Sequence, residues 1–145
     1  MRFWDTSALV SLVVDEPRSA VVREIYTDDT HLTVWWGTEV ECVSAVSRIE
    51  REGDVSREQA VNALHRLDEL AGTWFEVDPS AEIRRTARRL VLVHPLKAAD
   101  ALQLSAAIAA SEDDRASVAF VSFDARLRRA AALEGFAVLP DQQQV

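Results

Sequence analysis

The chain has 145 residues, of which 48% are hydrophobic and 28% are charged, as expected for one ordinary globular domain. Its formal net charge of −8 argues against a general nucleic-acid coat protein, because phosphate binding draws on positive charge. Cys42 is the only cysteine, which excludes an internal disulfide, and the three histidines lack zinc-finger spacing. The sequence shows neither a signal-peptide pattern nor an apolar run of about 18 residues, so we expect a cytoplasmic protein without membrane contact.

Short apolar stretches alternate with segments of helical periodicity along the chain. In chain order, the pattern predicts a strand at 1–4, helices at 8–14 and 19–27, a strand at 31–35, helices at 38–52 and 56–71, a strand at 73–77, a helix starting at Pro79, a helix at 97–110, a strand at 117–123, a helix at 125–134 and a strand at 136–139. This alternation is typical of an α/β domain with a mainly parallel sheet flanked by helices. No repeat or linker divides the chain, so we expect a single domain over residues 1–145. The pattern leaves the strand order open.

Some local details also follow from the pattern. Either Thr6 or Ser7 is expected to cap the first helix, and Asp78 is expected to cap the helix that begins with Pro79. Two helices show clear apolar stripes, which are predicted to face the core: Val61, Leu64, Leu67 and Ala71 in one, and Ile83, Ala87, Leu90 and Val91 in the other.

Four carboxylates stand in apolar surroundings, unlike most acids of the chain. Asp5 ends the first apolar strand, and Asp124 directly follows the strand "VAFVSF". Glu41 lies in "GTEVECVSAV", and Asp100 interrupts a helix otherwise built mainly from Ala, Leu and Ile. Removing a lone carboxylate from water costs several kcal/mol, so each of these acids needs a partner or a function. A first-turn position favoured by the helix dipole is the alternative explanation for Asp100.

All four acids are expected at one edge of the sheet. Asp5 and Asp124 follow strands, while Glu41 and Asp100 lie near the starts of helices. Ligands of open α/β sheets bind at the carboxyl ends of the strands. Clustered carboxylates repel one another unless a cation joins them, and a purely oxygen ligand set favours Mg²⁺, with Mn²⁺ as a substitute. Such ions support hydrolysis of phosphodiesters.

Four motifs in order resemble the PIN domain, and in particular the VapC toxins of toxin–antitoxin modules. They are "WDTSAL", "VECVSAVSRIEREG", "HPLKAADALQLSAA" and "FVSFDARLRRAAALEGF", and together they span nearly the whole chain. The resemblance implies a three-layer α/β/α fold and a Mg²⁺-dependent endoribonuclease. It also implies an RNA substrate, a homodimer and inhibition by a cognate antitoxin that inserts a segment into the active-site groove.

The resemblance also assigns residues. Asp5, Glu41, Asp100 and Asp124 match the family's acidic quartet, with Asp5 and Asp100 as the foremost metal ligands. Three hydroxyl residues match supporting positions: Thr6, Ser7 and Ser122. Glu39 is a rival to Glu41, which we prefer because Ala45 and Arg48 follow it with the family's spacing.

Basic residues and Cys42 carry weaker signals. The arginines of two helices are interpreted mainly as solvated faces, with one or two near the groove binding phosphate; they are Arg84, Arg85, Arg88 and Arg89, and Arg126, Arg128 and Arg129. Lys97 shares a helical face with Asp100 and is a candidate to neutralise it. Cys42 is interpreted as a buried small hydrophobe rather than a nucleophile.

Two other functions remain open from the sequence. A phosphotransfer domain with Asp5 as nucleophile would want an Asp-x-Asp pair, but Ser7 occupies the second position. A non-catalytic module that keeps the fold without a metal is the other alternative, although all four acids are present.

Overall fold

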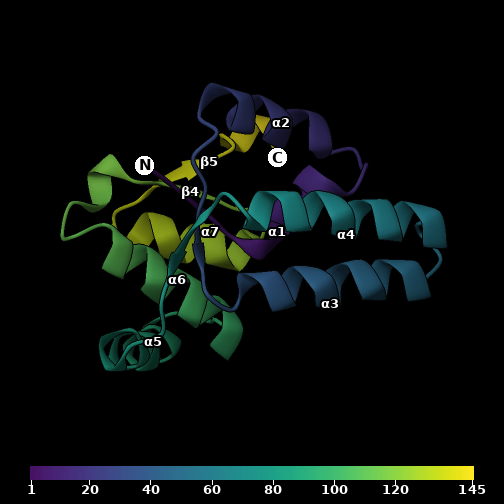
Figure 1. The fold of residues 1–145 in the computed structure, drawn as a ribbon. Coiled ribbons are helices and arrows are strands. Elements are labelled where there is room, and N and C mark those ends of the chain that lie inside the picture. The colour runs from purple at the N-terminus through teal and green to yellow at the C-terminus, as the bar shows by residue number, and fades with distance from the viewer.

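The computed structural model describes all 145 residues and is built on a five-stranded sheet (Figure 1). Its strands are β1 (Arg2–Trp4), β2 (Thr33–Trp35), β3 (Phe75–Val77), β4 (Ala119–Val121) and β5 (Ala137–Leu139). Every neighbouring pair is parallel, in the order β3-β2-β1-β4-β5. The predicted strands are therefore present, each shorter than its sequence pattern, and the predicted parallel sheet is confirmed.

Seven helices cover the two faces of the sheet. They are α1 (Thr6–Val13), α2 (Ser19–Asp28), α3 (Thr38–Arg51), α4 (Arg57–Ala71), α5 (Ala81–Val93), α6 (Ala98–Ala110) and α7 (Ala125–Leu133). One buried cluster joins the sheet to α1, α2, α3 and α4, and a second joins it to α5, α6 and α7. The helices α3 and α4 run side by side and extend away from the sheet (Figure 1). This arrangement confirms the expected three-layer α/β/α fold.

The three central strands, β1, β2 and β4, are mainly apolar because both of their faces are largely buried, whereas the edge strands β3 and β5 each begin with an exposed residue. Successive side chains of a strand point to opposite faces of the sheet, so each strand contributes side chains to both cores. Trp4, Val34 and Val121 join the core of α1–α4. Phe3, Trp35 and Phe120 join the core of α5–α7, where the rings of Phe3 and Phe120 stack with centroids 5.6 Å apart. Burial of each large side chain contributes about 1.5–3 kcal/mol.

The strand order creates a crevice between β1 and β4. From the central β1 the chain moves outward to β2 and β3, and it then returns to β4 on the other side of β1 before β5. Right-handed crossovers in opposite directions place the following helices, α1 and α7, on opposite faces of the sheet. The carboxyl ends of β1 and β4 thus form the topological switch point, where ligands of α/β sheets bind.

Two expected helix caps are corrected by the structure. The cap of α1 is Asp5 rather than Thr6 or Ser7, since its carboxylate accepts the backbone N–H of Ser7. The cap of α5 is Ser80 rather than Asp78, since its hydroxyl accepts the N–H of Ile83. In both cases the acceptor reaches a free N–H of the first turn, and the exact register is decided by the path of the preceding strand.

The expected apolar stripes are partly corrected. Val91 is 41% exposed because it lies about 100° around α5 from the buried Leu90. In α4, Val61 is 37% exposed, and the buried positions are Ala60, Ala63 and Leu67. Small alanines there allow α4 to approach α3 and α1 closely. No helix in the structure combines the length and the apolar character that crossing a membrane would require.

Candidate active site

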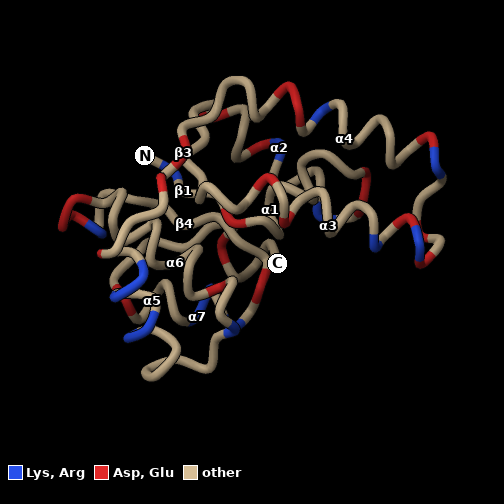
Figure 2. The backbone as a smooth tube through the Cα atoms, turned by 60° about the horizontal axis from the view of Figure 1, so that its bottom comes forward, with Lys and Arg blue, Asp and Glu red and all other residues tan.

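A cleft of about 840 Å³ opens at the carboxyl ends of the central strands. Its walls come from α1, the α1–α2 connection, α3, the start of α6 and the β4–α7 connection. All four sequence-predicted acids line it, as do two of the three supporting hydroxyl residues: Asp5, Glu41, Asp100 and Asp124, with Thr6 and Ser7. Figure 2 shows acidic positions from several chain segments converging beside α1. The third hydroxyl residue, Ser122, is fully buried beneath the cleft.

Asp5 is the buried centre of this cleft. Its side chain directly follows β1 and is only 3% exposed. Oδ2 accepts three hydrogen bonds, from the Ser7 N–H at 3.2 Å, the Ser7 hydroxyl at 2.5 Å and the Ser122 hydroxyl at 2.8 Å. Burial nevertheless raises the pKa of Asp5 to about 6, with the charge of Asp100 adding to the rise. Because Oδ1 accepts none of these bonds, it stays available to a cation.

The supporting hydroxyls join the ends of β1 and β4. The Ser7 hydroxyl accepts the N–H of Phe123 at 2.9 Å, and the Ser122 hydroxyl accepts the N–H of Asp124 at 3.1 Å. The two hydroxyl oxygens lie 3.3 Å apart. The network fixes the β4–α7 connection, which carries Asp124, against the residue that follows β1.

Glu41 is held by a residue that the sequence interpretation missed. Its Oε2 accepts the Thr6 hydroxyl at 2.7 Å and the Gln103 amide at 3.0 Å. The amide nitrogen of Gln103 also lies 3.0 Å from the Thr6 oxygen and 2.9 Å from that of Thr38. Glu39, the rival of Glu41, is exposed and does not line the cleft.

A signal for Gln103 was present in the sequence. It is a polar residue in the largely apolar α6, three positions after Asp100 and hence on the same helical face. The side chain is fully buried, and its Oε1 has no hydrogen-bond partner. An unpaired buried acceptor costs about 1–3 kcal/mol, so stability alone does not explain this residue.

The other two acids are more accessible. Asp100 is half-buried in the first turn of α6, and burial raises its pKa, helped by the charges of Asp124 and Glu41 and opposed by Lys97. Asp124 is exposed and caps α7 through a 2.8 Å bond from the Leu127 N–H to Oδ1. One oxygen of Asp124 therefore has a structural role.

The carboxylate oxygens of the cleft suit one hard divalent cation, although they do not form a complete coordination site. No three His, Cys, Asp or Glu side chains are grouped closely enough to hold an ion by themselves. Mg²⁺ is commonly bound through one or two carboxylates, waters and substrate phosphate, which this open cleft allows. Five carboxylates, including Glu16, and three cationic side chains line the cleft, so one divalent cation balances their formal charge.

Cys42 adds no reactive group to the site. It is fully buried in the core of α1–α4, and burial raises the pKa of its thiol well above the ordinary value. The thiol therefore stays protonated at neutral pH, in keeping with its interpretation as a small hydrophobe.

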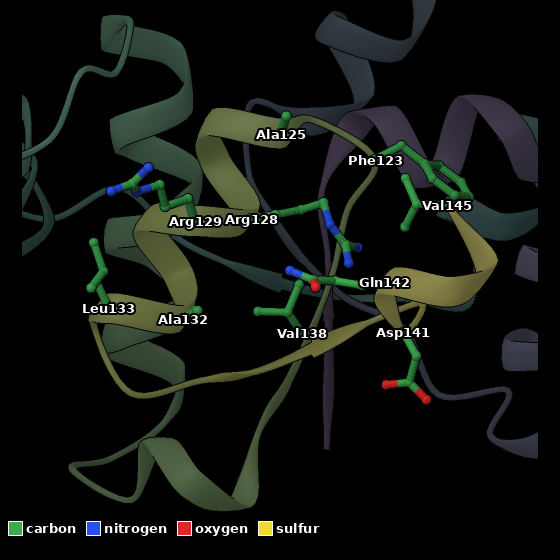
Figure 3. Close-up of a pocket in the computed structure, with 10 residues that line it drawn as sticks. All are labelled: Phe123, Ala125, Arg128, Arg129, Ala132, Leu133, Val138, Asp141, Gln142 and Val145. Carbon is green, nitrogen blue, oxygen red and sulfur yellow. The ribbon is translucent and has the colours of Figure 1, made fainter.

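A second hollow, of about 580 Å³, lies beside α7 and the C-terminal residues (Figure 3). Its lining includes none of the four acids. Arg128 points from α7 toward the C-terminal turn and donates to the carbonyls of Ser122, Leu139 and Pro140. Arg128 therefore joins the residue after β4 to the end of β5 and the residue that follows it, and it is not free to bind phosphate.

The arginines of α5 lie away from the cleft. Basic positions line this outer helix (Figure 2), and none of its four arginines lines the cleft. Arg89 forms a two-point ion pair with Glu134 at 2.9 and 3.0 Å. The interpretation of these arginines as mainly a helix face on the surface agrees with the structure.

Comparison with known proteins decides the family. The PIN domain family model matches residues 2–133, nearly the whole chain. The chain belongs to the PIN-domain family. PIN domains are generally nucleases and typically depend on a divalent metal, and the acids of this PIN domain lie where its fold predicts a ligand. No curated protein matches the sequence significantly.

Solved structures of the same fold are distant in sequence. Mycobacterium tuberculosis VapC20, described as a sarcin-ricin loop cleaving toxin, has 17% identity and a TM-score of 0.62, with 94% of this chain and 96% of that chain covered. FitAcB from Neisseria gonorrhoeae has 16% identity and a TM-score of 0.65, with 97% of both chains covered. PAE2754 from Pyrobaculum aerophilum has 17% identity and a TM-score of 0.61, with 89% of this chain and 83% of that chain covered. At these identities the likeness shows the fold alone.

Proposed function

We propose that this PIN domain is a Mg²⁺-dependent endoribonuclease and the toxin of a toxin–antitoxin pair. The observation that carries the proposal is the meeting of Asp5, Glu41, Asp100 and Asp124 in one cleft at the switch point of the sheet. The description of VapC20 as a cleaving toxin supports the toxin role. Mn²⁺ is expected to substitute for Mg²⁺, because both are hard cations that accept oxygen ligands.

Each residue has a distinct task in the proposed reaction. Asp5 and Asp100 would hold the cation, with Glu41 and Asp124 completing its surroundings directly or through water. The bound ion supplies a polarised phosphoryl oxygen and a more acidic water. Ser7 and Ser122 keep Oδ2 of Asp5 in place, and Thr6 does the same for Glu41. Preorganised groups of this kind need no rearrangement when charge develops at the phosphate.

The proposal includes two protein partners. A cognate antitoxin is proposed to insert a segment into the cleft, which is open to solvent and large enough for several side chains. A homodimer is proposed as the solution state. Light scattering on the purified protein measures the dimer directly, and co-purification with the product of the neighbouring reading frame tests the antitoxin.

Cleavage of RNA by protein freed of any partner tests the proposal. We expect cleavage with Mg²⁺ or Mn²⁺ and none with EDTA, and sequencing of the cut ends would identify the target. Asp5→Ala protein is the control for contaminating nuclease. Equal cleavage by that variant, or no cleavage of any RNA by the wild type, would contradict the assignment.

The non-catalytic module remains the second candidate. The specific observation in its favour is that no three potential ligands are already grouped around one point. A module of that kind would neither cleave RNA nor gain stability from millimolar Mg²⁺ or Mn²⁺, whereas the proposed nuclease does both.

A further inference from the structure

Three cationic side chains line the cleft together with the acids. Arg18 precedes α2, Arg48 lies on α3, and Lys97 precedes α6. All three residues are exposed. They therefore approach the cleft from three separate elements of the fold.

None of these three cations forms an ion pair or a side-chain hydrogen bond within the protein. Five other arginines do form ion pairs: Arg2, Arg23, Arg57, Arg89 and Arg115. Arg18, Arg48 and Lys97 keep their donors free although five carboxylates line the same cleft. Their hydrogen-bonding capacity is thus available to a ligand.

Arg18 is also held in place relative to the hydroxyl network. Its guanidinium carbon lies 5.0 Å from the centre of the Phe123 ring, within the range of a cation–π contact. Phe123 is only 5% exposed, and its N–H donates to the Ser7 hydroxyl. The ring thus fixes one face of the guanidinium beside the site, while the N–H donors at its edge remain unpaired.

The arrangement fits a ligand with repeated negative charges. The protein carries a net charge of −8, so an anionic chain is repelled over most of its surface. Phosphates in RNA are separated by uncharged sugars, which lets successive phosphates reach separate cations while one linkage lies against the carboxylates and their metal. Arginine and lysine are the usual partners of such phosphates.

We propose that Arg18, Arg48 and Lys97 form a phosphate track that holds single-stranded RNA on both sides of the bond that is cut. This inference rests on the proposed nuclease function and extends it to the residues that bind the substrate. Phosphate contacts of this kind position the chain without reading its sequence.

Salt-dependent RNA binding tests the track without requiring cleavage. Labelled single-stranded RNA is titrated with Asp100→Asn protein in Mg²⁺ at several KCl concentrations. Each lost phosphate contact is expected to reduce the slope of log affinity against log salt by about 0.7 and to weaken binding roughly three- to tenfold. R18A, R48A and K97A, each combined with Asp100→Asn, should reduce the salt slope and weaken RNA binding. The size of both changes should be similar for unrelated RNA sequences.

Matched controls separate the track from general surface charge. Arg51 lies on the same helix as Arg48, and Arg126 lies near Asp124, but neither lines the cleft. R51A and R126A should therefore bind RNA as the parent does. R18K should keep the slope, because it keeps the charge, but bind more weakly, because it loses the flat face that rests on Phe123.

The outcomes distinguish this inference from the function on which it rests. If wild type cleaves RNA but the three track variants match R51A and R126A, the track is wrong and the nuclease assignment stands. If the wild type neither binds nor cleaves RNA, the proposed function fails and the track with it. If the three variants bind RNA normally but lose an acidic protein partner, the cations serve that protein instead and the track is overturned.

Discussion

Ser122, directly after β4, donates a 2.8 Å hydrogen bond to Asp5, which lies 117 positions earlier and directly after β1. The two strands are adjacent and parallel, so this bond crosses the switch point of the sheet. It ties the proposed metal ligand of the first motif to the last motif of the chain. The predictions below follow from this relationship and from the residues around it.

Asp100→Asn is expected to abolish RNA cleavage and leave the fold intact. Asp100 is half-buried next to other acids, and burial raises its pKa, so removal of its charge relieves repulsion while the proposed metal loses a ligand. Gel assays of cleavage and circular dichroism of the purified variant measure the two effects. Unchanged cleavage by Asp100→Asn would remove it from the catalytic set.

Mg²⁺ or Mn²⁺ is expected to raise the melting temperature of the wild type. A ligand that binds only the native state stabilises it, by about 2.7 kcal/mol at 100 times its dissociation constant. Thermal scans with millimolar metal, matched in ionic strength with KCl, measure the shift. The melting temperatures of Asp5→Asn and Asp100→Asn should rise less when metal is added. Equal rises in all three proteins would mean that the metal binds outside the proposed site.

The stability of the metal-free protein is expected to fall as pH rises through about 6. The pKa of Asp5 is raised from 3.8 to about 6, so the folded state binds a proton more tightly than the unfolded state between these values. Above pH 6 the buried charge costs about 3 kcal/mol, and below pH 4 this cost is absent. Urea unfolding in EDTA at pH 4.5 and 7.5 measures the change.

Asp5→Asn is the control for this titration, because an amide cannot lose a proton in this range. The difference between wild type and Asp5→Asn should be small at pH 4 and should favour the variant at pH 7.5. A difference that does not change with pH would mean that folding does not raise the pKa of Asp5.

Gln103→Leu is expected to lower cleavage at least tenfold with little change in global stability. Gln103 acts through Glu41, because its amide holds Oε2 of that carboxylate together with Thr6. Leucine loses the amide's contacts with Glu41, Thr6 and Thr38 but also removes the unpaired Oε1, and these opposing effects should keep the change in the free energy of unfolding to about 1 kcal/mol.

Kinetics and metal titration separate positioning from folding in this variant. Gln103→Leu should lower kcat and Mn²⁺ affinity more than it changes KM. Ser105→Ala is the matched control, since Ser105 is also buried in α6 but donates to the Ile83 carbonyl away from the cleft. If both variants lose activity equally, the effect comes from the helix rather than from Glu41.

Glu134→Gln is expected to destabilise the protein by about 2 kcal/mol at pH 7 without affecting cleavage by the folded protein. Glu134 accepts hydrogen bonds from Arg89, His94 and Arg115, and the bond from Arg89 is the main reason that its pKa is lowered from 4.5 to about 2. A lowered carboxyl pKa stabilises the folded state above the unfolded value, and this contribution is lost as pH falls toward 2. Chemical unfolding should show that the wild type exceeds Glu134→Gln in stability by less at pH 3 than at pH 7. Glu52→Gln, a change at an exposed position, should have the same stability as the wild type at both pH values.

The sequence predicted the parts of the site that depend on local pattern. An acid directly after an apolar strand must lie at the carboxyl edge of a parallel sheet, which placed Asp5 and Asp124 correctly. Three-residue spacing predicted Lys97 and Asp100 on one side of a helix, and both line the cleft although Lys97 lies just before α6. The sequence pattern was wrong about the lengths of the strands, about two helix caps and about the edges of two apolar stripes, where neighbouring elements decide the outcome.

The partners of those residues could not be predicted in the same way. From its neighbours in the sequence, Gln103 is only a polar residue in a largely apolar helix, and the tertiary fold alone brings its amide to Thr38 and Glu41 of α3. The sequence spacing does not predict that Glu134 pairs with Arg89, His94 and Arg115. Glu134 follows α7, whereas Arg89 and His94 belong to α5 and its cap, and Arg115 to the short turn before β4.

The amino-acid pattern alone determined that this is an α/β domain with acids at one sheet edge, because apolar periodicity and strand-end positions are properties of neighbouring residues. The tertiary structure alone decided the strand order, the burial of Asp5, the hold of Gln103 on Glu41 and the freedom of Arg18, Arg48 and Lys97. Those features depend on which distant groups share a few ångströms of space, and that is set by how the helices pack on the sheet.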